Sequence, residues 1–296
     1  MAALEGVRFV DVDATLAQTF RDYARTFGAV HGETGITHDE TTGFDPAAEP
    51  AVLALDEFDA PHGAASVMLA GDGHARFRVL HALDPALYAP LIEAVTARVP
   101  ETVSWVCLFL PEHAGVIEET LTASGFAKSR RAYVMLHPSP TATTEPELPA
   151  ETTLSVALPT VSSDWTFIVN AAFHGYPGHT DLTLERAAEL LARPEVIKGG
   201  TLIAYRGGSP AGVVMTAADP KNPFEAEIEM LAVLPADQHV GLGRALLRAA
   251  LLAAGHDGRS SVILSVSTFS KRAMAMYLDA GFNVHDVRVC WELRRP

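Results

Sequence analysis

The stretch Gln238–Arg244 has the residue types and spacing of an anion-binding turn. It reads Gln-His-Val-Gly-Leu-Gly-Arg, follows the apolar run Ile228–Leu234 and opens a helical pattern over Gly241–Ala254. The first N–H groups of a helix lack partners within the helix, and the helix dipole adds partial positive charge there. Gly241 and Gly243 would let a phosphate approach the backbone without meeting a Cβ atom. The same pattern also fits a plain strand-to-helix turn whose glycines serve packing.

Two side chains near this turn could transfer protons. Glu229 lies in the strand pattern before the turn, where two-residue alternation predicts that it shares a face with Leu231 and Val233. Tyr277 lies in a later helical pattern over Ser270–Leu278. A carboxylate can act as a general base and a phenol as a general acid. A solvated strand carboxylate and a core tyrosine are the structural alternatives.

The elements that must position these residues follow the same order in both halves of the chain. In the first half, strands are predicted over Val7–Val12, Ala51–Leu55, Ala64–Ala70, His74–Leu80, Val103–Leu110 and Ala132–Leu136, helices over Thr15–Phe27, Pro85–Val99 and Glu112–Ser124, and a loop over Gly28–Pro50. In the second half, strands are predicted over Thr152–Ala157, Thr201–Tyr205, Ala211–Thr216, Glu225–Leu234, Ser261–Val266 and Val287–Leu293, and helices over Ser162–Phe173, Leu184–Leu191, Gly241–Ala254 and Ser270–Leu278. This repetition favours duplication of one α/β unit.

The chain length and one proline-rich stretch predict two domains. The 296 residues suit about two domains, and His137–Ala150 contains four prolines and few apolar residues, as a stiff linker does. We therefore expect one domain over residues 1–136, a linker over 137–150 and a second domain over 151–296.

Charge and composition exclude several classes of function. The chain has 22 Lys and Arg residues against 36 Asp and Glu, a net charge of −14, which argues against nucleic acid or an anionic membrane surface as a partner. The most apolar helix, Ala245–Ala254, is too short to cross a membrane and carries Arg248. The first residues, Met1–Asp11, lack the apolar core of a secretory signal. We expect a cytoplasmic protein with two free thiols and no metal site.

With these elements in place, residues 151–296 resemble the GNAT acetyltransferase superfamily. In that family a Gln/Arg-x-x-Gly-x-Gly/Ala turn follows the fourth strand and cradles the pyrophosphate of acetyl-CoA; Gln238, Gly241 and Gly243 match it. A later Asn-x-x-Ala-x-x-x-Tyr…Gly-Phe pattern carries the general-acid tyrosine. Ala273, Tyr277, Gly281 and Phe282 match this pattern, but Ser270 stands where asparagine is usual and could simply cap the helix.

The resemblance implies two tandem GNAT-like α/β domains, each with a mixed, mostly antiparallel central sheet flanked by helices. It implies an N-acetyltransferase that moves an acetyl group from acetyl-CoA to a primary amine of a small molecule by direct attack. Tyr277 would protonate the leaving thiolate, and Glu229 would take the amine proton directly or through water, with Glu227 as a competitor. The residues implied to contact acetyl-CoA are Leu231, Ala232, Val233, Gln238, His239, Val240, Gly241, Leu242, Gly243, Arg244 and Ser270.

The first half resembles the same fold in element order only. Asp84–Tyr88 replaces the glycine turn, and Leu121 stands at the position of Tyr277, so we expect a degenerate copy without chemistry. A duplicated chain favours a monomer over a homodimer. The loop from His174 to Asp181 shapes the acceptor site in this family, or is an ordinary surface loop. The alternative to an enzyme is an acyl-CoA-binding sensor without turnover, and the sequence does not identify the amine.

Overall fold

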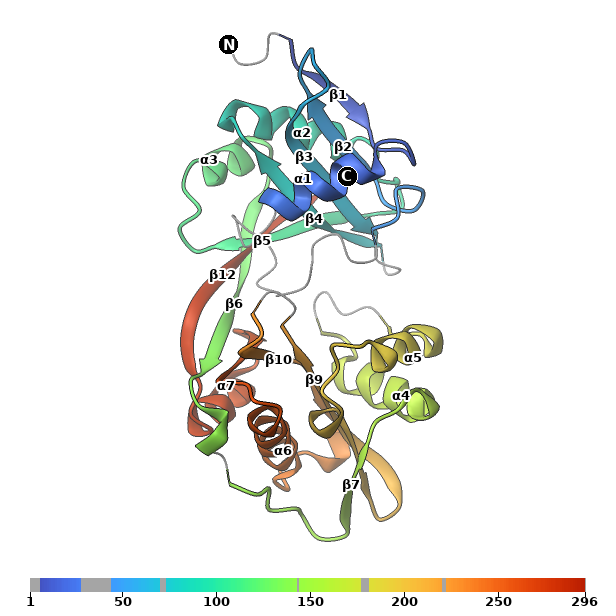
Figure 1. Ribbon diagram of the computed structural model, residues 1–296, viewed down its shortest axis with the longest axis vertical. Helices are drawn as coiled ribbons and strands as arrows, with labels where there is room; N and C mark the ends of the chain where they lie inside the picture. The colour runs from blue at the N-terminus through green and yellow to red at the C-terminus, as the bar shows by residue number, and fades with distance from the viewer. Residues whose placement is uncertain are drawn as a thin grey trace. The chain divides into compact units, whose positions relative to one another are not determined.

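The computed structural model describes residues 6–27, 44–69, 73–142, 144–176, 181–219 and 222–295. These residues form two compact units, Met1–Ala132 with Asp286–Pro296, and Tyr133–His285. Each unit is a sheet flanked by helices (Figure 1). Most of the predicted loop Gly28–Pro50 lies outside the described residues. No helix in the described part of the chain is long and apolar enough to span a bilayer.

The first unit is built on a sheet with the strand order β1-β2-β3-β4-β5-β12. Its pairs are antiparallel except for β4–β5. The apolar run of β2 is buried along its whole length, and helices bury their apolar stripes against the sheet. The elements are β1 (Arg8–Asp11), α1 (Ala17–Phe27), β2 (Ala51–Leu55), β3 (Pro61–Leu69), β4 (His74–Ala82), η3 (Pro85–Leu87), α2 (Tyr88–Thr96), β5 (Trp105–Pro111), α3 (Val116–Ala123) and β6 (Ala127–His137).

The second unit repeats this order with the sheet β11-β10-β9-β8-β7, in which β10–β11 is parallel and the other pairs are antiparallel. One apolar core contains α6 and α7 residues and another contains α4 and α5 residues. The predicted α/β fold is therefore confirmed. The elements are η4 (Pro140–Ala142), β7 (Thr152–Val156), η5 (Pro159–Val161), α4 (Ser162–Phe173), α5 (Leu184–Ala192), η6 (Lys198–Gly200), β8 (Leu202–Arg206), β9 (Ser209–Ala218), β10 (Glu225–Val233), η7 (Pro235–Asp237), α6 (Leu242–His256), β11 (Ser261–Ser267), α7 (Lys271–Asp279) and β12 (Asn283–Arg294).

The last strand of each half adds to the sheet of the other half. β12 follows α7, yet it pairs antiparallel with β5 of the first unit, from Arg288 opposite Pro111 to Arg294 opposite Trp105. The end of β6, which follows α3, belongs to the second unit, where β6 neighbours β11. The unit boundaries therefore differ from the sequence-based ranges, which keep residues 151–296 together. A strand pattern reveals which face is buried but not which strand will be its neighbour.

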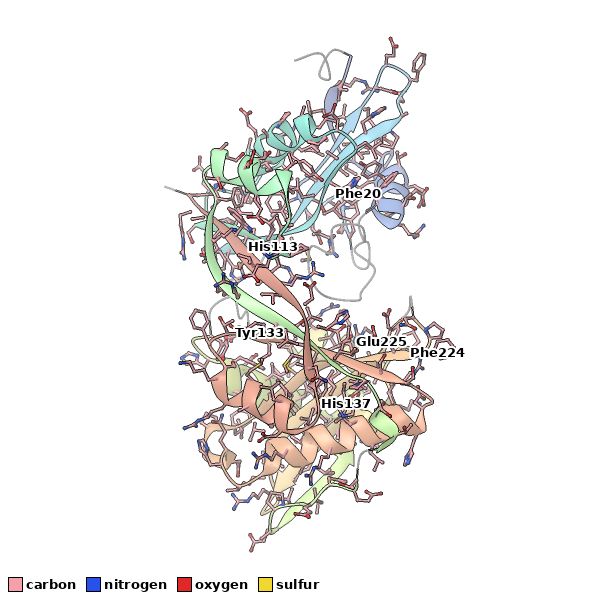
Figure 2. The ribbon with its side chains drawn as sticks, turned by 90° about the vertical axis from the view of Figure 1, so that its left-hand side faces the viewer. Phe20, His113, Tyr133, His137, Phe224 and Glu225 are labelled. Carbon is pink, nitrogen blue, oxygen red and sulfur yellow. The ribbon has the colours of Figure 1, made fainter. Side chains whose placement is uncertain are left out.

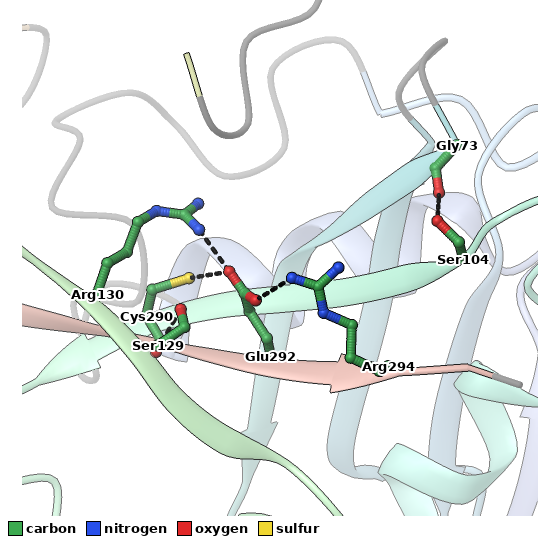
Figure 3. A network of polar contacts seen from close by, with 7 residues as sticks. All are labelled: Gly73, Ser104, Ser129, Arg130, Cys290, Glu292 and Arg294. Atoms are coloured by element: carbon green, nitrogen blue, oxygen red, sulfur yellow. Dashed lines mark hydrogen bonds and ion pairs between the residues drawn. The ribbon is translucent and has the colours of Figure 1, made fainter. Parts of the chain in front are cut away.

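β6 also begins at Ala127, five residues before the predicted strand, because its charged residues have partners in the first unit. Lys128 lies 2.6 Å from a Glu118 carboxylate oxygen and 4.9 Å from the centre of the Trp291 ring. Arg130 forms an ion pair with Glu292 of β12 (Figure 3). The charged start of β6 is thus part of a strand, and its Lys128 and Arg130 side chains have acidic partners.

The Arg130–Glu292 pair fixes the added strand β12 in the first unit. The side chains of Arg130 and Glu292 are only 11% and 9% exposed, and Arg294 adds a second, 73% exposed guanidinium to Glu292. The Cys290 thiol also points to the Glu292 carboxylate (Figure 3). A buried ion pair contributes little beyond its desolvation cost, but removing one partner leaves a buried, unpaired charge.

We predict that Glu292→Ala destabilises the first unit by about 3 kcal/mol, because it leaves the Arg130 guanidinium buried without its carboxylate. Urea unfolding of the variant in a Trp165→Phe background measures this loss. The remaining tryptophans, Trp105 and Trp291, both belong to the first unit and report on it alone.

Arg294→Ala is the matched control, since it removes the exposed partner of the same carboxylate and should change stability by less than about 0.5 kcal/mol. Equal, small effects of the two substitutions would contradict a fixing role for the buried pair.

Candidate functional site

The second unit contains a cavity of about 740 Å³ next to β10, the turn that follows it, and α7. Leu231 and Val233 of β10 line one part, and Met276 and Tyr277 of α7 line another. The wall is apolar along β10 and α7 and polar at the turn, so the cavity suits a ligand with an apolar arm and a polar head.

A divergence of two strands opens this cavity. β10 pairs with β11 only from Glu225 to Glu227, but it pairs with β9 as far as Val233. Beyond Glu227, no strand in the described part of the chain pairs with the β11 side of β10. Backbone N–H and C=O groups demand partners, so this stretch can accept an extended ligand as an added strand.

The turn between β10 and α6 has the backbone geometry of an anion cradle. His239 has φ of 68° and Gly241 has φ of 95°, so two residues lie in the left-handed region. The Gln238 amide donates to the Val233 carbonyl at 3.1 Å and closes the turn onto the end of β10. Gly241 then caps α6, whose first N–H groups are free of internal partners. Successive backbone N–H groups in such a turn can surround a phosphate.

Tyr277 lies deep in the site, with 7% of its surface exposed. Burial raises the pKa of its phenol to about 12, and the nearby Tyr176 adds to this shift. Tyr277 is therefore a neutral proton donor throughout the physiological pH range. Its ring packs 5.8 Å from that of Phe282, which fixes the phenol between the core and the cavity.

Ser270 precedes α7 and makes a contact that the sequence does not predict. Its hydroxyl makes no capping hydrogen bond to the helix backbone and instead hydrogen-bonds to the Tyr176 hydroxyl. Ser270 is therefore the N-cap residue of α7, as one sequence-based alternative has it, but its side chain does not cap the helix. Tyr176 comes from the loop after α4, so this hydrogen bond joins that loop to the start of α7 at the cavity.

The Gly281-Phe282 pair after α7 is explained by His137. Gly281 has φ of 97°, and a Cβ atom there would lie 3.1 Å from the His137 Nε2 atom. His137, labelled in Figure 2, meets the Phe282 ring edge-on at 5.2 Å. This position thus requires glycine both for its backbone angle and for space, and the turn anchors the C-terminal end of α7.

Glu229 differs from its predicted placement because β10 has a bulge. The β9 register passes from Ile228 to Met230, so Glu229 is the extra residue and strict alternation fails there. Ile228, not Glu229, packs in one core with Leu231 and Val233. The prediction that Glu229 shares a face of β10 with Leu231 and Val233 is therefore wrong.

The two carboxylates of β10 lie in different environments. Glu229 forms an ion pair with Arg193, which follows α5, and its side chain is 12% exposed. Glu227 is buried at 5% exposure within the fully paired part of β10. Neither carboxylate is among the described residues that line the cavity.

The cavity brings most of the predicted contact residues together, but not all. Those lining it are Leu231, Val233, Gln238, His239, Gly241, Gly243, Arg244, Ser270 and Tyr277. Ala232 and Leu242 are buried in the core, and Val240 is 41% exposed outside the cavity. The lining also contains Lys271 and Arg272 at the start of α7, and Phe269 and Met276, which the sequence pattern did not single out. Their position next to Ser270 and Tyr277 was the available signal.

The first unit has the same framework without the cradle. β4 pairs in parallel with β5 over only three residues and has a bulge at Arg78, two residues after the last parallel pair, as at Glu229. However, η3 leads directly into α2, whereas Gln238–Gly241 separates η7 from α6. The Asp84 carboxylate accepts the Ala86 N–H at 2.9 Å and so occupies the place of an anion. The position of Tyr277 is taken by the fully buried Leu121.

Comparisons with known proteins agree with this geometry. Residues 165–282 match the model of the acetyltransferase (GNAT) family. The chain is 30% identical to mycothiol acetyltransferases of Frankia alni, over 56% of this chain and 54% of that protein, and of Frankia casuarinae, over 70% and 63%. The matches thus span less than two thirds of these relatives. A solved tandem GNAT protein from the clavulanic acid biosynthesis pathway superposes with a TM-score of 0.71 at 16% identity, covering 98% of this chain and 99% of that one.

We predict that Tyr277 remains un-ionised until about pH 12, because burial disfavours the phenolate. In the unfolded chain it would ionise near 10, so this group stabilises the fold below pH 10, and that contribution disappears between pH 10 and 12. The difference in phenolate absorbance between the wild type and Tyr277→Phe during titration isolates this group. Ionisation with a midpoint near 10, while circular dichroism stays native, would contradict the assignment.

Proposed function

Because residues 165–282 match the model of the acetyltransferase (GNAT) family, we propose that this chain transfers an acetyl group from acetyl-CoA to the primary amine of a small molecule. The observation that carries the proposal is the buried phenol of Tyr277 in the same cavity as the left-handed turn at Gly241. Acetyl-CoA carries phosphates on its nucleotide and releases a thiolate from its thioester. Together in one cavity, a neutral acid and a turn that can bind phosphates meet both needs.

The bound acetyl-CoA would supply the acetyl group as an activated thioester. The exposed backbone of β10 around Leu231 and Val233 would hold its pantetheine arm, and an N–H there would stabilise the oxyanion that develops on the carbonyl. The amine nitrogen forms the new C–N bond, and the C–S bond breaks. Tyr277 donates its proton to the leaving sulfur, and the proton lost by the amine goes to a base or to water.

We predict that Tyr277→Phe lowers kcat about 100-fold, because the thiolate then leaves without a proton donor. Affinity for acetyl-CoA should stay nearly unchanged, since the ring and its packing remain. Thiol release with an amine acceptor measures the first quantity and calorimetry the second. Tyr205→Phe is a suitable control, because that hydroxyl donates to Asp164 on α4 and does not line the cavity. A parallel loss of affinity would show a packing role instead.

The base is proposed to be Glu229, directly or through water, with Glu227 as the weaker candidate because it is enclosed by paired strands. The rival role for Glu229 is structural. At the corresponding bulge of the first unit, Arg78 pairs with Glu49 at 2.6 Å, with both side chains 12% exposed. The two units thus have the same ion pair with the charges reversed, which would lock the bulge in either unit.

Exchanging the charges separates these two roles. We predict that the double variant Glu229→Arg, Arg193→Glu keeps the ion pair and the melting temperature but loses about 100-fold in kcat, because the bulge no longer carries a base. The single variant Glu229→Arg should destabilise the fold, since it opposes two cations. Recovery of full activity in the double variant would overturn Glu229 as the base and leave the structural role.

The rival function is an acyl-CoA sensor without turnover. It predicts tight binding of acetyl-CoA and no thiol release with any amine. The amine panel should include desacetyl mycothiol, because the Frankia relatives are named mycothiol acetyltransferases. We propose that the chain acts as a monomer in the cytoplasm and that the first unit does no chemistry. Binding of two acetyl-CoA molecules per chain would contradict the last point.

A further inference from the structure

Basic side chains gather at the mouth of the cavity in the second unit, although the whole chain has a net charge of −14. His239, Arg244, Lys271 and Arg272 line this part of the cavity, and the described lining contains no aspartate or glutamate. Local charge of the opposite sign to the whole chain indicates a site for an anion rather than a device for solubility.

Arg244 has an acidic partner, whereas His239, Lys271 and Arg272 have no ion pair with a carboxylate in the described part of the chain. Arg244 lies 3.1 Å from the Asp279 carboxylate, and both side chains are 64% exposed. Arg272 instead contacts the His239 ring, with 2.7 Å between its Nη1 and the Nε2 atom. In the described part of the chain, Arg272 has no carboxylate within ion-pair distance, and Lys271 has neither a hydrogen bond nor an ion pair. A guanidinium that contacts an imidazole retains donors for an anion.

The backbone at His239 adds an independent observation. Its φ of 68° is uncommon for a residue with a side chain, and such strain persists where the surrounding structure requires it. This conformation brings the imidazole to Arg272, which lies in the first turn of α7. The turn after β10 and the start of α7 therefore present their basic groups to one point.

The cavity runs from a buried end to an exposed mouth, and this difference indicates which end of the ligand the basic residues meet. Tyr277 is buried, whereas His239, Lys271 and Arg272 are exposed. On the proposed function, the thioester reaches Tyr277 and the nucleotide end remains at the mouth. The backbone N–H groups of the turn serve the diphosphate, which leaves the basic side chains for the remaining phosphate.

We propose that Arg272, with His239 and Lys271, binds the 3′-phosphate of coenzyme A and makes the protein select coenzyme A over dephospho-coenzyme A. This assignment rests on the proposed function, because it requires that the cavity binds acetyl-CoA. A phosphate monoester carries up to two negative charges at neutral pH, so it gains more from a guanidinium fork than a neutral ribose hydroxyl does.

The test compares coenzyme A with dephospho-coenzyme A, which lacks only the 3′-phosphate, by calorimetry on the full chain. We expect the wild type to prefer coenzyme A by about tenfold or more, the usual effect of a charged hydrogen bond. Arg272→Ala should remove most of this preference and leave the affinity for dephospho-coenzyme A within about twofold. Arg186→Ala is the matched control, since that arginine lies on α5, pairs with Glu189 at 3.0 Å and does not line the cavity.

Each other outcome has a distinct meaning. An equal loss of both affinities in Arg272→Ala would overturn the assignment, because Arg272 would then bind the diphosphate. Equal affinities of the wild type for the two compounds would also overturn it while leaving the proposed function intact. Failure of the wild type to bind either compound, or acetyl-CoA, would overturn the proposed function and this assignment with it.

Discussion

The site in the second unit depends on the need of backbone polar groups for partners. β10 leaves β11 after Glu227 but keeps its pairing with β9, so one edge of a central strand faces the cavity. Such an edge inside a sheet is costly unless water or a ligand pairs with it. The turn at Gly241 and the helix carrying Tyr277 lie next to the same opening. The proposed places of the phosphates, the pantetheine arm and the acid therefore all lie beside one divergence of two strands.

The first unit shows the same framework without the left-handed turn. Its central strand diverges and bulges in the same way, but the cradle turn is missing and the Asp84 carboxylate takes up the backbone donor itself. Leu121 fills the place of the phenol. An ion pair occurs at the bulge of both units with its charges reversed, which indicates that the pair stabilises the bulge. The two units thus have the same framework, and the left-handed turn at Gly241 belongs to the second unit.

The fold was largely predictable because apolar periodicity and glycine turns act over short ranges. The run before Gln238, the helix after Gly241 and the helix of Tyr277 all formed near their predicted bounds. The predictions failed where distant partners decide. The bulge at Glu229 depends on the register with β9, and the contact of Ser270 depends on Tyr176, 94 residues away. The charged start of β6 lies beside β12 in the sheet, and Glu118, Trp291 and Glu292 contact its charged side chains.

The exchange of last strands has a consequence for biosynthesis. In most multidomain proteins the N-terminal domain emerges from the ribosome first and folds while the rest of the chain is being synthesised. Here β12 is translated after all of Tyr133–His285, yet it completes the sheet that begins with β1. The nascent first unit must therefore wait with β5 as an open edge, a template for wrong pairing, until the second unit has emerged. The first unit is thus completed only after the second unit has been synthesised.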